Sequence, residues 1–340
     1  MEFTMSGRLE VRVTPADVGK RVSLRSMTDP GDTGAHLTDT VGVLTSWTAG
    51  VVCVTRKNGV AVRIPQERLV AGKVVPPAPA RRRDLPAASF TELTRVAARG
   101  WPPVESEPLG EWTLRASGGF TRRANSVLAL GEPGLPLDAA LEHVTAWYAR
   151  RALPAYVQVG TGAEGADELL AAALAERGWV REVSAEVRIA GLAPVLDAAE
   201  EAGSEVAVRL DRAPGAAWLG RYQRSGEPGP EVLRVLGGGP SVWFATVPGA
   251  PAGAARPAAI GRCVVDGRWA GFAAVEVNPD RRRQGLAHAV MAALARQALA
   301  EGASAGYLQV EHDNAAALGL YTRLGFAPHH TYHHYRAPRG

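Results

Sequence analysis

Residues 269–302 read WAGFAAVEV NPDRRRQGL AHAVMAALARQALAEG, and the pattern of the sequence changes twice within them. Residues 269–277 are an apolar run broken only by Glu276, which predicts a buried β-strand. Residues 287–302 carry apolar side chains at helical spacing, which predicts an amphipathic helix. Between them lies Gly285, which lets the backbone approach a ligand closely. Because a helix N-terminus offers unpaired N–H groups and the positive end of the helix dipole, we predict an anion-binding loop here.

A second motif follows in residues 311–326, EHDNAAALGLYTRLGF. Asn314 is a preferred N-cap residue and predicts the start of a helix, which ends before Gly325. Tyr321 comes seven residues after Asn314, so the two residues share one helix face, two turns apart. The preceding residues 306–311, GYLQVE, predict another strand. The sequence therefore repeats a strand, turn and helix within 60 residues of the first one.

Together the two motifs resemble the GNAT superfamily of acetyl-CoA-dependent N-acetyltransferases. Arg282-x-x-Gly285-x-Ala287 is similar to the acyl-CoA pyrophosphate loop of that superfamily, R/Q-x-x-G-x-G/A. Residues 314–326 are similar to its N-x-x-A-x-x-x-Y-x-x-x-G-F pattern. The resemblance implies a catalytic GNAT domain over residues 204–338, with an α/β fold on a mixed central sheet. It also implies that acetyl-CoA is the co-substrate and that an amine attacks it directly.

The resemblance assigns roles to individual residues. In this superfamily the strand at 271–277 splays from the strand at 307–310, and the pantetheine amides pair with its exposed edge as in a β-ladder. Tyr321 is then the general acid that protonates the departing CoA thiolate, and Asn314 hydrogen-bonds the pantetheine arm. The expected cofactor-binding residues are Val275, Val277, Arg282, Arg283, Gln284, Gly285, Leu286, Ala287, Asn314, Ala317 and Tyr321.

The general base is not fixed by the resemblance. Some GNAT enzymes have a glutamate twelve residues before the tyrosine, where this chain has Gln309, which cannot accept a proton at neutral pH. Glu311 lies two residues further along the same strand face, and Glu276 lies beside the predicted splay. Either carboxylate could work through a water molecule, and we favour Glu276 slightly.

An internal duplication precedes this domain. Residues 155–180, AYVQVGTGAEGADELLAAALAERGWV, match residues 306–327, GYLQVEHDNAAALGLYTRLGFA, in strand, helix and the final glycine–aromatic pair. Leu174 stands where Tyr321 stands, and Asp167 falls near Asn314. Because no R-x-x-G-x-G/A loop occurs in this part, residues 89–195 resemble the degenerate lobe of a tandem GNAT protein.

That first lobe contains GGFTRRANSVL at residues 118–128, which is unusual for a mere scaffold. Arg122, Arg123 and Asn125 beside a strand could bind a carboxylate or phosphate of the acceptor, or they could form surface salt bridges. With Gln309, they are the predicted acceptor-site residues.

Residues 8–75 alternate β-rich runs with turn signals. The runs are LEVRV, KRVSLRS, TVGVLTSW, VVCVTRKN and VAVRIP, with Asn58-Gly59 as a hairpin turn and 64–75 closing the barrel. The pattern resembles a small all-β SH3-like barrel, which could bind a protein partner. Residues 76–88, rich in proline and arginine, predict an extended linker.

Composition sets outer limits on the function. The chain has 340 residues, 46% hydrophobic and 21% charged, which fits a folded protein of several domains. The net charge of +4 is spread along the chain, so nucleic-acid binding is not favoured. Its N-terminus lacks the pattern of a signal peptide, and no membrane span is expected, so we predict a cytoplasmic protein. Four histidines in residues 329–334 lack the companions of a metal site, and we expect substrate contact or an edge-strand surface instead, with no metal.

We therefore predict an N-acetyltransferase that uses a small amine or amino acid, with glutamate as one candidate. An alternative is a protein lysine or N-terminal acetyltransferase whose barrel recruits the target. A second alternative, from a different class, is a non-catalytic acyl-CoA sensor or interaction module.

Overall fold

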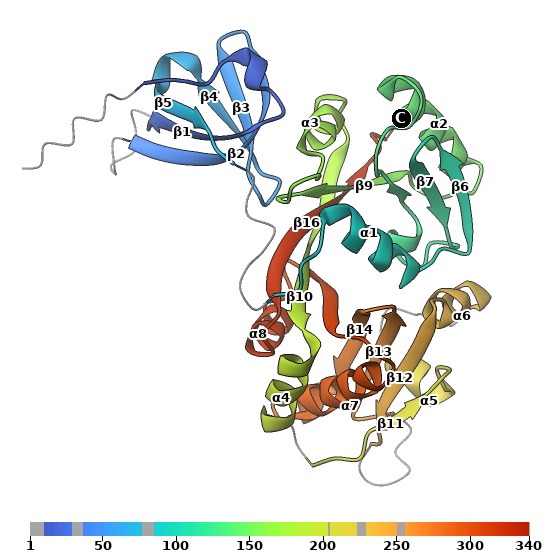
Figure 1. Ribbon diagram of the computed structural model, residues 1–340. Helices are drawn as coiled ribbons and strands as arrows, with labels where there is room; N and C mark the ends of the chain where they lie inside the picture. The colour runs from blue at the N-terminus through green and yellow to red at the C-terminus, as the bar shows by residue number, and fades with distance from the viewer. Residues whose placement is uncertain are drawn as a thin grey trace, which may run out of the picture.

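The computed structural model describes residues 10–28, 37–76, 85–202, 205–222, 229–249 and 256–339. Within them the strands form a five-stranded sheet near the N-terminus and an eleven-stranded sheet in the remainder of the chain (Figure 1). The mixed α/β fold preceded by a small all-β domain, predicted from the sequence, is confirmed. Among the described residues no helix is both long and apolar enough to cross a membrane.

The N-terminal sheet has the order β4-β3-β2-β1-β5. Its strands are β1 (Arg21–Met27), β2 (Leu37–Thr48), β3 (Val51–Thr55), β4 (Ala61–Pro65) and β5 (Leu69–Val74). Alternate side chains such as Val22, Leu24 and Leu44 are fully buried in a small core. The prediction of a strand at residues 9–13 is wrong for the described residues 10–13, where Val11 makes a single bridge to Gly72. The strand that closes the sheet is β5.

The first lobe contains β6 (Glu105–Leu109), β7 (Trp112–Ala116), β8 (Val127–Leu128), β9 (Tyr156–Thr161) and β10 (Val180–Gly191). Its helices are α1 (Phe90–Arg99), α2 (Leu137–Ala149), α3 (Glu168–Glu176) and α4 (Leu192–Ala202). One face is an apolar core that includes the fully buried Trp147 and Leu114. The strand and the helix predicted within residues 155–180 are confirmed as β9 and α3.

The second lobe contains β11 (Arg209–Asp211), β12 (Ser241–Val247), β13 (Ala259–Asp266), β14 (Trp269–Val277), β15 (Ala305–Glu311) and β16 (Ala327–Arg336). Its helices are α5 (Ala216–Arg221), α6 (Pro230–Gly237), α7 (Leu286–Ala300) and α8 (Ala315–Arg323). Val290, Met291 and Leu294 of α7 are fully buried against the sheet. Burial of each such side chain stabilises the fold by about 1.5–3 kcal/mol, so α7 is held firmly at the end of the predicted loop.

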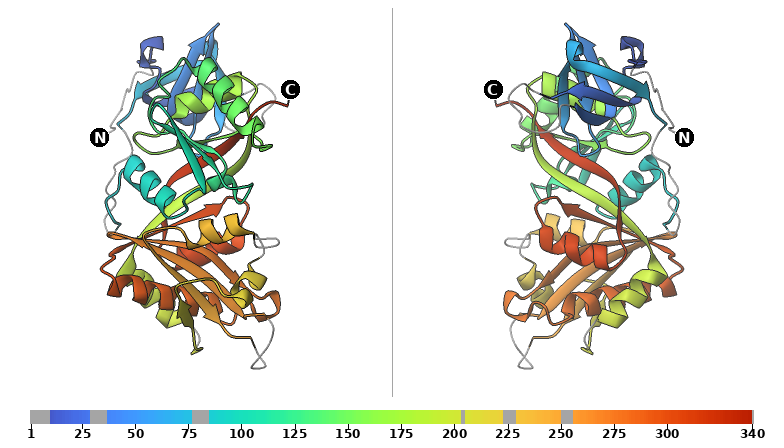
Figure 2. Two further views of the ribbon diagram at one scale, coloured as in Figure 1. Left: turned by 90° about the vertical axis from the view of Figure 1, so that its right-hand side faces the viewer. Right: turned by 90° about the vertical axis from the view of Figure 1, so that its left-hand side faces the viewer.

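The two lobes exchange their last strands. The order β11-β12-β13-β14-β15-β10-β16-β9-β8-β7-β6 places β10 of the first lobe beside β15, and β16 of the second lobe beside β9. Figure 2 shows these two long strands running together between the halves of the molecule. The pairing register repeats as well. Tyr156 lies opposite Arg336 in the pair β9–β16, and the aligned Tyr307 lies opposite Ile189 in the pair β15–β10. The duplicated halves are thus joined in one sheet by a near two-fold relation.

This exchange corrects one prediction about the histidines. Over residues 331–336, β16 is not an edge strand, because it pairs there with β10 on one side and with β9 on the other. His330, His333 and His334 are each at most 2% exposed.

The barrel contacts the shared sheet through the turn between β3 and β4. The backbone carbonyl of Lys57 accepts a hydrogen bond from Thr161 Oγ1 at 3.0 Å. Gly59 has φ of 72°, and a Cβ there would lie 2.3 Å from Nε2 of His333, so glycine is required both by the turn and by the close approach.

Candidate active site

A β-bulge opens the sheet beside the predicted cofactor loop. β14 and β15 pair in parallel only from Trp269 opposite Ala305 to Phe272 opposite Leu308, although both strands continue beyond this point. Just past it, the register between β13 and β14 shifts and Ala274 takes a left-handed φ of 54°. A bulge bends its strand and increases the local twist, so it directs the end of β14 away from β15.

The loop that follows ends in left-handed backbone at the start of α7. Arg283 has φ of 58°, and Gly285, the residue before the helix, has φ of 73° and ψ of 0°. Arg281 Nε donates to the side-chain oxygen of Gln284 at 2.8 Å, which ties the loop together. The side chain of Leu286 is buried in the core, so at this position only the backbone can face a ligand. The first N–H groups of α7 therefore point outward at a helix N-terminus, as an anion site requires.

Replacing Gly285 with valine is expected to raise the KM for acetyl-CoA by roughly 10- to 100-fold, because a β-branched residue resists left-handed φ and its Cβ crowds the N–H groups. Gly302 at the other end of α7 also has a left-handed φ, of 90°, and a Cβ there would meet nothing within 4 Å. Gly302→Val is the matched control, because it introduces the same strain of a β-branched residue at left-handed φ but at a position far from the loop. Steady-state kinetics and calorimetric titration with CoA would test this, and equal KM values for the two variants would contradict it.

A cavity of about 480 Å³ begins where β14 and β15 part. Residues from both lobes line it. They are Thr121, Arg122, Arg123, Val183, Tyr222, Phe272, Ala273, Ala274, Val275, Glu276, Gln309, Val310, Glu311, Asn314, Ala317, Tyr321, Tyr332 and His334. The tertiary structure thus brings together most of the predicted catalytic and acceptor residues. Of the predicted cofactor-binding residues, Val275, Asn314, Ala317 and Tyr321 also line the cavity. Val277 and the loop residues 282–287 lie outside this lining.

Tyr321 lies on the inner face of α8. Asn314 caps this helix, because its Oδ1 accepts a hydrogen bond from the Ala317 N–H at 3.1 Å, as the sequence predicts. The Tyr321 side chain is 8% exposed and its ring meets the Phe326 ring edge-on. Burial raises the pKa of Tyr321 to about 12. The phenol is therefore protonated throughout the neutral range and can only donate its proton.

Gln309 is held by an arginine of the other lobe. Arg123 Nη1 donates to Gln309 Oε1, and the guanidinium lies 4.4 Å from the centre of the Trp101 ring. The side-chain carbonyl of Gln309 therefore accepts the hydrogen bond that Arg123 donates. Glu276 and Glu311, the two candidate bases, line the same cavity on either side of the opening between β14 and β15.

A glutamate at position 309 is expected to supply no general base. The Arg123 guanidinium would hold the pKa of the new carboxyl below its usual range, so it would remain ionised and weakly basic. For Gln309→Glu we expect kcat/KM to change less than about threefold, with an unshifted profile between pH 6 and 9. A new ionisation near neutral pH in the profile of the variant would show that this reasoning is wrong.

The other acceptor candidates differ in their placement. Arg122 lines the cavity and lies 5.6 Å from the centre of the Tyr156 ring. Asn125 is not brought into the cavity lining. Its side chain accepts hydrogen bonds from the backbone of Ser117 and Gly119 and donates to the Thr121 carbonyl. Because these bonds occupy the amide, Asn125 shapes the loop that carries the two arginines.

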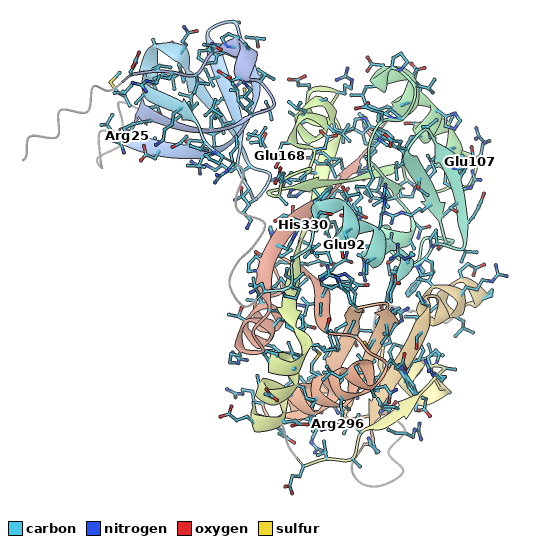
Figure 3. The ribbon with its side chains drawn as sticks, viewed as in Figure 1. Arg25, Glu92, Glu107, Glu168, Arg296 and His330 are labelled. Atoms are coloured by element: carbon cyan, nitrogen blue, oxygen red, sulfur yellow. The ribbon has the colours of Figure 1, made fainter. Side chains whose placement is uncertain are left out.

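Helix α1 fills the corresponding place in the first lobe. Gly160 aligns with Glu311, and the Phe90 ring lies so close that a Cβ on Gly160 would be 2.2 Å from it. On the other side Phe90 meets His330 of β16 edge-on, with ring centres 4.9 Å apart. Figure 3 labels the position of His330. The space left beside these residues, about 20 Å³, is the size of one water molecule. This lobe therefore has no room for an acyl-CoA arm at the place where the second lobe has its cavity.

The sequence did not single out Thr121, Val183, Tyr222 or Tyr332 as part of the site. It named His334 only within the histidine cluster, with substrate contact as one possibility. The period-two pattern of residues 329–336 signals which side chains share a face, but it does not reveal which neighbouring strands cover that face.

Two family models match the chain. The family described as "Probable histone acetyltransferase Rv0428c C-terminal" matches residues 87–335, and "Rv0428c N-terminal Sm-like domain" matches residues 16–73. The N-terminal barrel is therefore of the Sm-like type.

Among individual proteins, the chain is similar to the "Probable histone acetyltransferase Rv0428c" of Mycobacterium tuberculosis, with 29% identity over 92% of this chain and 93% of the relative. A GCN5-related N-acetyltransferase from Kribbella flavida shares the fold, with a TM-score of 0.54 and 18% identity over 75% of this chain and 98% of that one. A tandem GNAT protein from the clavulanic acid biosynthesis pathway also shares it, with a TM-score of 0.50 and 14% identity over 78% and 91% of the two chains.

Proposed function

Since the chain belongs to the family described as "Probable histone acetyltransferase Rv0428c C-terminal" and is an N-acetyltransferase of the GNAT type, we propose that it transfers the acetyl group of acetyl-CoA directly to the primary amine of a small acceptor. The observation that carries the proposal is the opening between β14 and β15, which leads into a cavity that contains Tyr321. Acetyl-CoA fits this arrangement as co-substrate, with its pyrophosphate at residues 282–287 and its pantetheine arm along the free edge of β14.

The reaction needs one bond made and one bond broken. The neutral amine attacks the thioester carbonyl carbon, the C–N bond forms, and collapse of the tetrahedral intermediate breaks the C–S bond. The nitrogen loses one proton and the sulfur gains one, so the products are an N-acetylated amine and CoA thiol. Tyr321 donates its hydroxyl proton toward the departing sulfur, and Glu276 or Glu311 accepts the amine proton through water.

A small acceptor, an amine or an amino acid, is favoured by the dimensions and walls of the cavity. Both lobes contribute to its lining, and about 480 Å³ accommodates an amino acid such as glutamate beside the thioester. A protein lysine or N-terminus is the second candidate, because a relative bears the name of a probable histone acetyltransferase and because the Sm-like barrel could recruit a target.

The test is acceptor-dependent release of CoA thiol by the full chain. The panel contains amino acids, polyamines, histone-tail peptides and peptides with free N-termini, each mixed with acetyl-CoA and followed by a thiol reagent. Mass spectrometry of the product then locates the acetyl group. Turnover with small amines supports the proposal, whereas turnover confined to peptides would replace it with the second candidate.

A further inference from the structure

The charges that line the cavity are separated between the two lobes. Arg122 and Arg123 come from the first lobe, and Glu276 and Glu311 come from the second. Acetyl transfer would take place near Tyr321, where β14 and β15 part and where these two carboxylates line the cavity. A molecule that complements such a cavity has an ammonium group at one end and an anionic group at the other.

Arg122 and Arg123 are held very differently. Arg123 is bound to Gln309 and stacked on Trp101, so its guanidinium is already engaged in the structure. Arg122 has its nearest carboxylate oxygen, Glu182 Oε2, at 3.6 Å, which is beyond hydrogen-bonding distance. That carboxylate also accepts a hydrogen bond from the Tyr156 hydroxyl at 2.8 Å and pairs with Arg336. The positive charge of Arg122 is therefore only weakly neutralised by Glu182, and the Arg122 side chain is 47% exposed.

His334 also lines the cavity, and it contacts the same Tyr156 ring over which Arg122 lies. Its side chain is 2% exposed, and neither of its ring nitrogens has a hydrogen-bond partner among the described residues. Leaving a buried polar group unpaired costs about 1–3 kcal/mol, so its presence requires an explanation. The rings of Tyr156 and Tyr332 meet it edge-on, with centres 6.3 and 5.5 Å away, and fix the orientation of the imidazole.

The neighbouring histidine shows that this lack of partners is specific. His333 precedes His334 on β16 and points to the other face of the sheet, where its Nδ1 lies 2.7 Å from Ser184 Oγ and its Nε2 lies 3.0 Å from Thr161 Oγ1. Both nitrogens of His333 therefore have partners within the fold, while those of the cavity-lining His334 have none in the described part of the chain.

We propose that the acceptor is an amino acid whose carboxylate binds between Arg122 and His334 while its amine lies toward Glu276 and Glu311. The proposal rests on the acetyltransferase function proposed above and names the charge pattern of its substrate. A neutral imidazole provides one N–H donor and the guanidinium of Arg122 provides a charged one, which together match the two oxygens of a carboxylate. Burial and the nearby Arg115, Arg122 and Arg123 lower the pKa of His334 well below its ordinary value, so the ring is neutral at physiological pH.

The test compares variants across matched acceptors. Each pair consists of an amino acid and its carboxamide, such as L-glutamate and its α-amide, L-alanine and L-alaninamide; O-phosphoethanolamine and spermidine are added singly. His334→Phe keeps a ring but removes both nitrogens, and Arg122→Gln removes the charge. We expect each variant to raise the KM for the carboxylate member by roughly 10- to 100-fold and to change that for the amide less than about threefold. His334→Gln should recover part of the loss, and Arg296→Gln, which removes an exposed cation of α7, should change neither.

A binding measurement separates this proposal from the catalytic one. In the CoA-loaded protein, the imidazole resonances of His334, assigned by their loss in His334→Gln, should shift on titration with L-glutamate or L-alanine and not with the amides. If these shifts occur while no amine is acetylated, the site assignment stands and the acetyltransferase proposal fails. Equal effects of the variants on both members of a pair would overturn the proposal. Preferential turnover of spermidine, O-phosphoethanolamine or peptides would also overturn it.

Discussion

Replacing Tyr321 with phenylalanine is expected to lower kcat by about 100- to 10,000-fold, the range that removal of a positioned general acid produces. The hydroxyl is the group that meets the departing sulfur in the proposed reaction, and its pKa of about 12 keeps it protonated at every pH at which the enzyme would be assayed. Because thiols ionise near pH 8.5, full transfer from this phenol is uphill, and the main gain is a strong hydrogen bond to the thiolate as the C–S bond breaks.

The fold should tolerate this substitution. The Tyr321 ring packs against Phe326 at the edge of the second-lobe core, and phenylalanine preserves that contact. We therefore expect the calorimetric Kd for acetyl-CoA and the thermal midpoint to stay close to those of the wild type, while single-turnover thiol release slows. If kcat is unchanged with the best acceptor, Tyr321 is only a packing residue and the proton reaches the sulfur from elsewhere.

Acidification from pH 7.5 to 5.5 is expected to lower the unfolding free energy by on the order of a few kcal/mol through three histidines of β16. Burial lowers the pKa of His333 from 6.5 to about 3, and it lowers the pKa of His330 and His334 well below 6.5. In this pH range the unfolded chain binds protons that the folded chain does not. Stability is therefore complete above the unfolded pKa and falls as the pH drops below it, by on the order of 1 kcal/mol at pH 5.5 for His333, whose folded pKa lies below this range.

Urea titrations at the two pH values would measure this effect, which is large beside a typical total stability of about 5–15 kcal/mol. The variant His333→Gln can keep hydrogen bonds to Ser184 and Thr161 but has no ionisable ring. It should lose on the order of 1 kcal/mol less than the wild type between pH 7.5 and 5.5. His312→Gln, at an exposed position, is the control. An identical pH dependence for His333→Gln and the wild type would contradict the assignment of this loss to β16.

The exchange of strands gives these histidines their environment. A strand rich in histidine and tyrosine would be half solvated at a sheet edge, but here its neighbours come from two segments far apart in the chain. The same arrangement brings Arg123 to Gln309, 186 residues further along the sequence. It also explains how the first lobe contributes residues to the cavity although it lacks the tyrosine and the loop.

Features determined by short-range geometry could be predicted from the sequence alone. The left-handed Gly285 before α7 follows from a strand, a glycine and an apolar helix in succession, and the Asn314 cap follows from an N-cap residue before a helical repeat. The duplication could be predicted as well, because both halves preserve the same local pattern. In each case the physical cause lies within a few residues of the motif.

Only the tertiary structure decided the pairing between distant strands and therefore the walls of the cavity. The strand expected at residues 9–13 had a suitable alternation, but in the described residues 10–13 it makes only a single bridge to Gly72. β16, whose sequence APHHTYHHYR has no such alternation, became central because β9 and β10 both pair with it. The sequence determined the loop before α7, the cap and the position of Tyr321 along α8. Which charges line the cavity depends on contacts between residues more than a hundred positions apart, which no local pattern records.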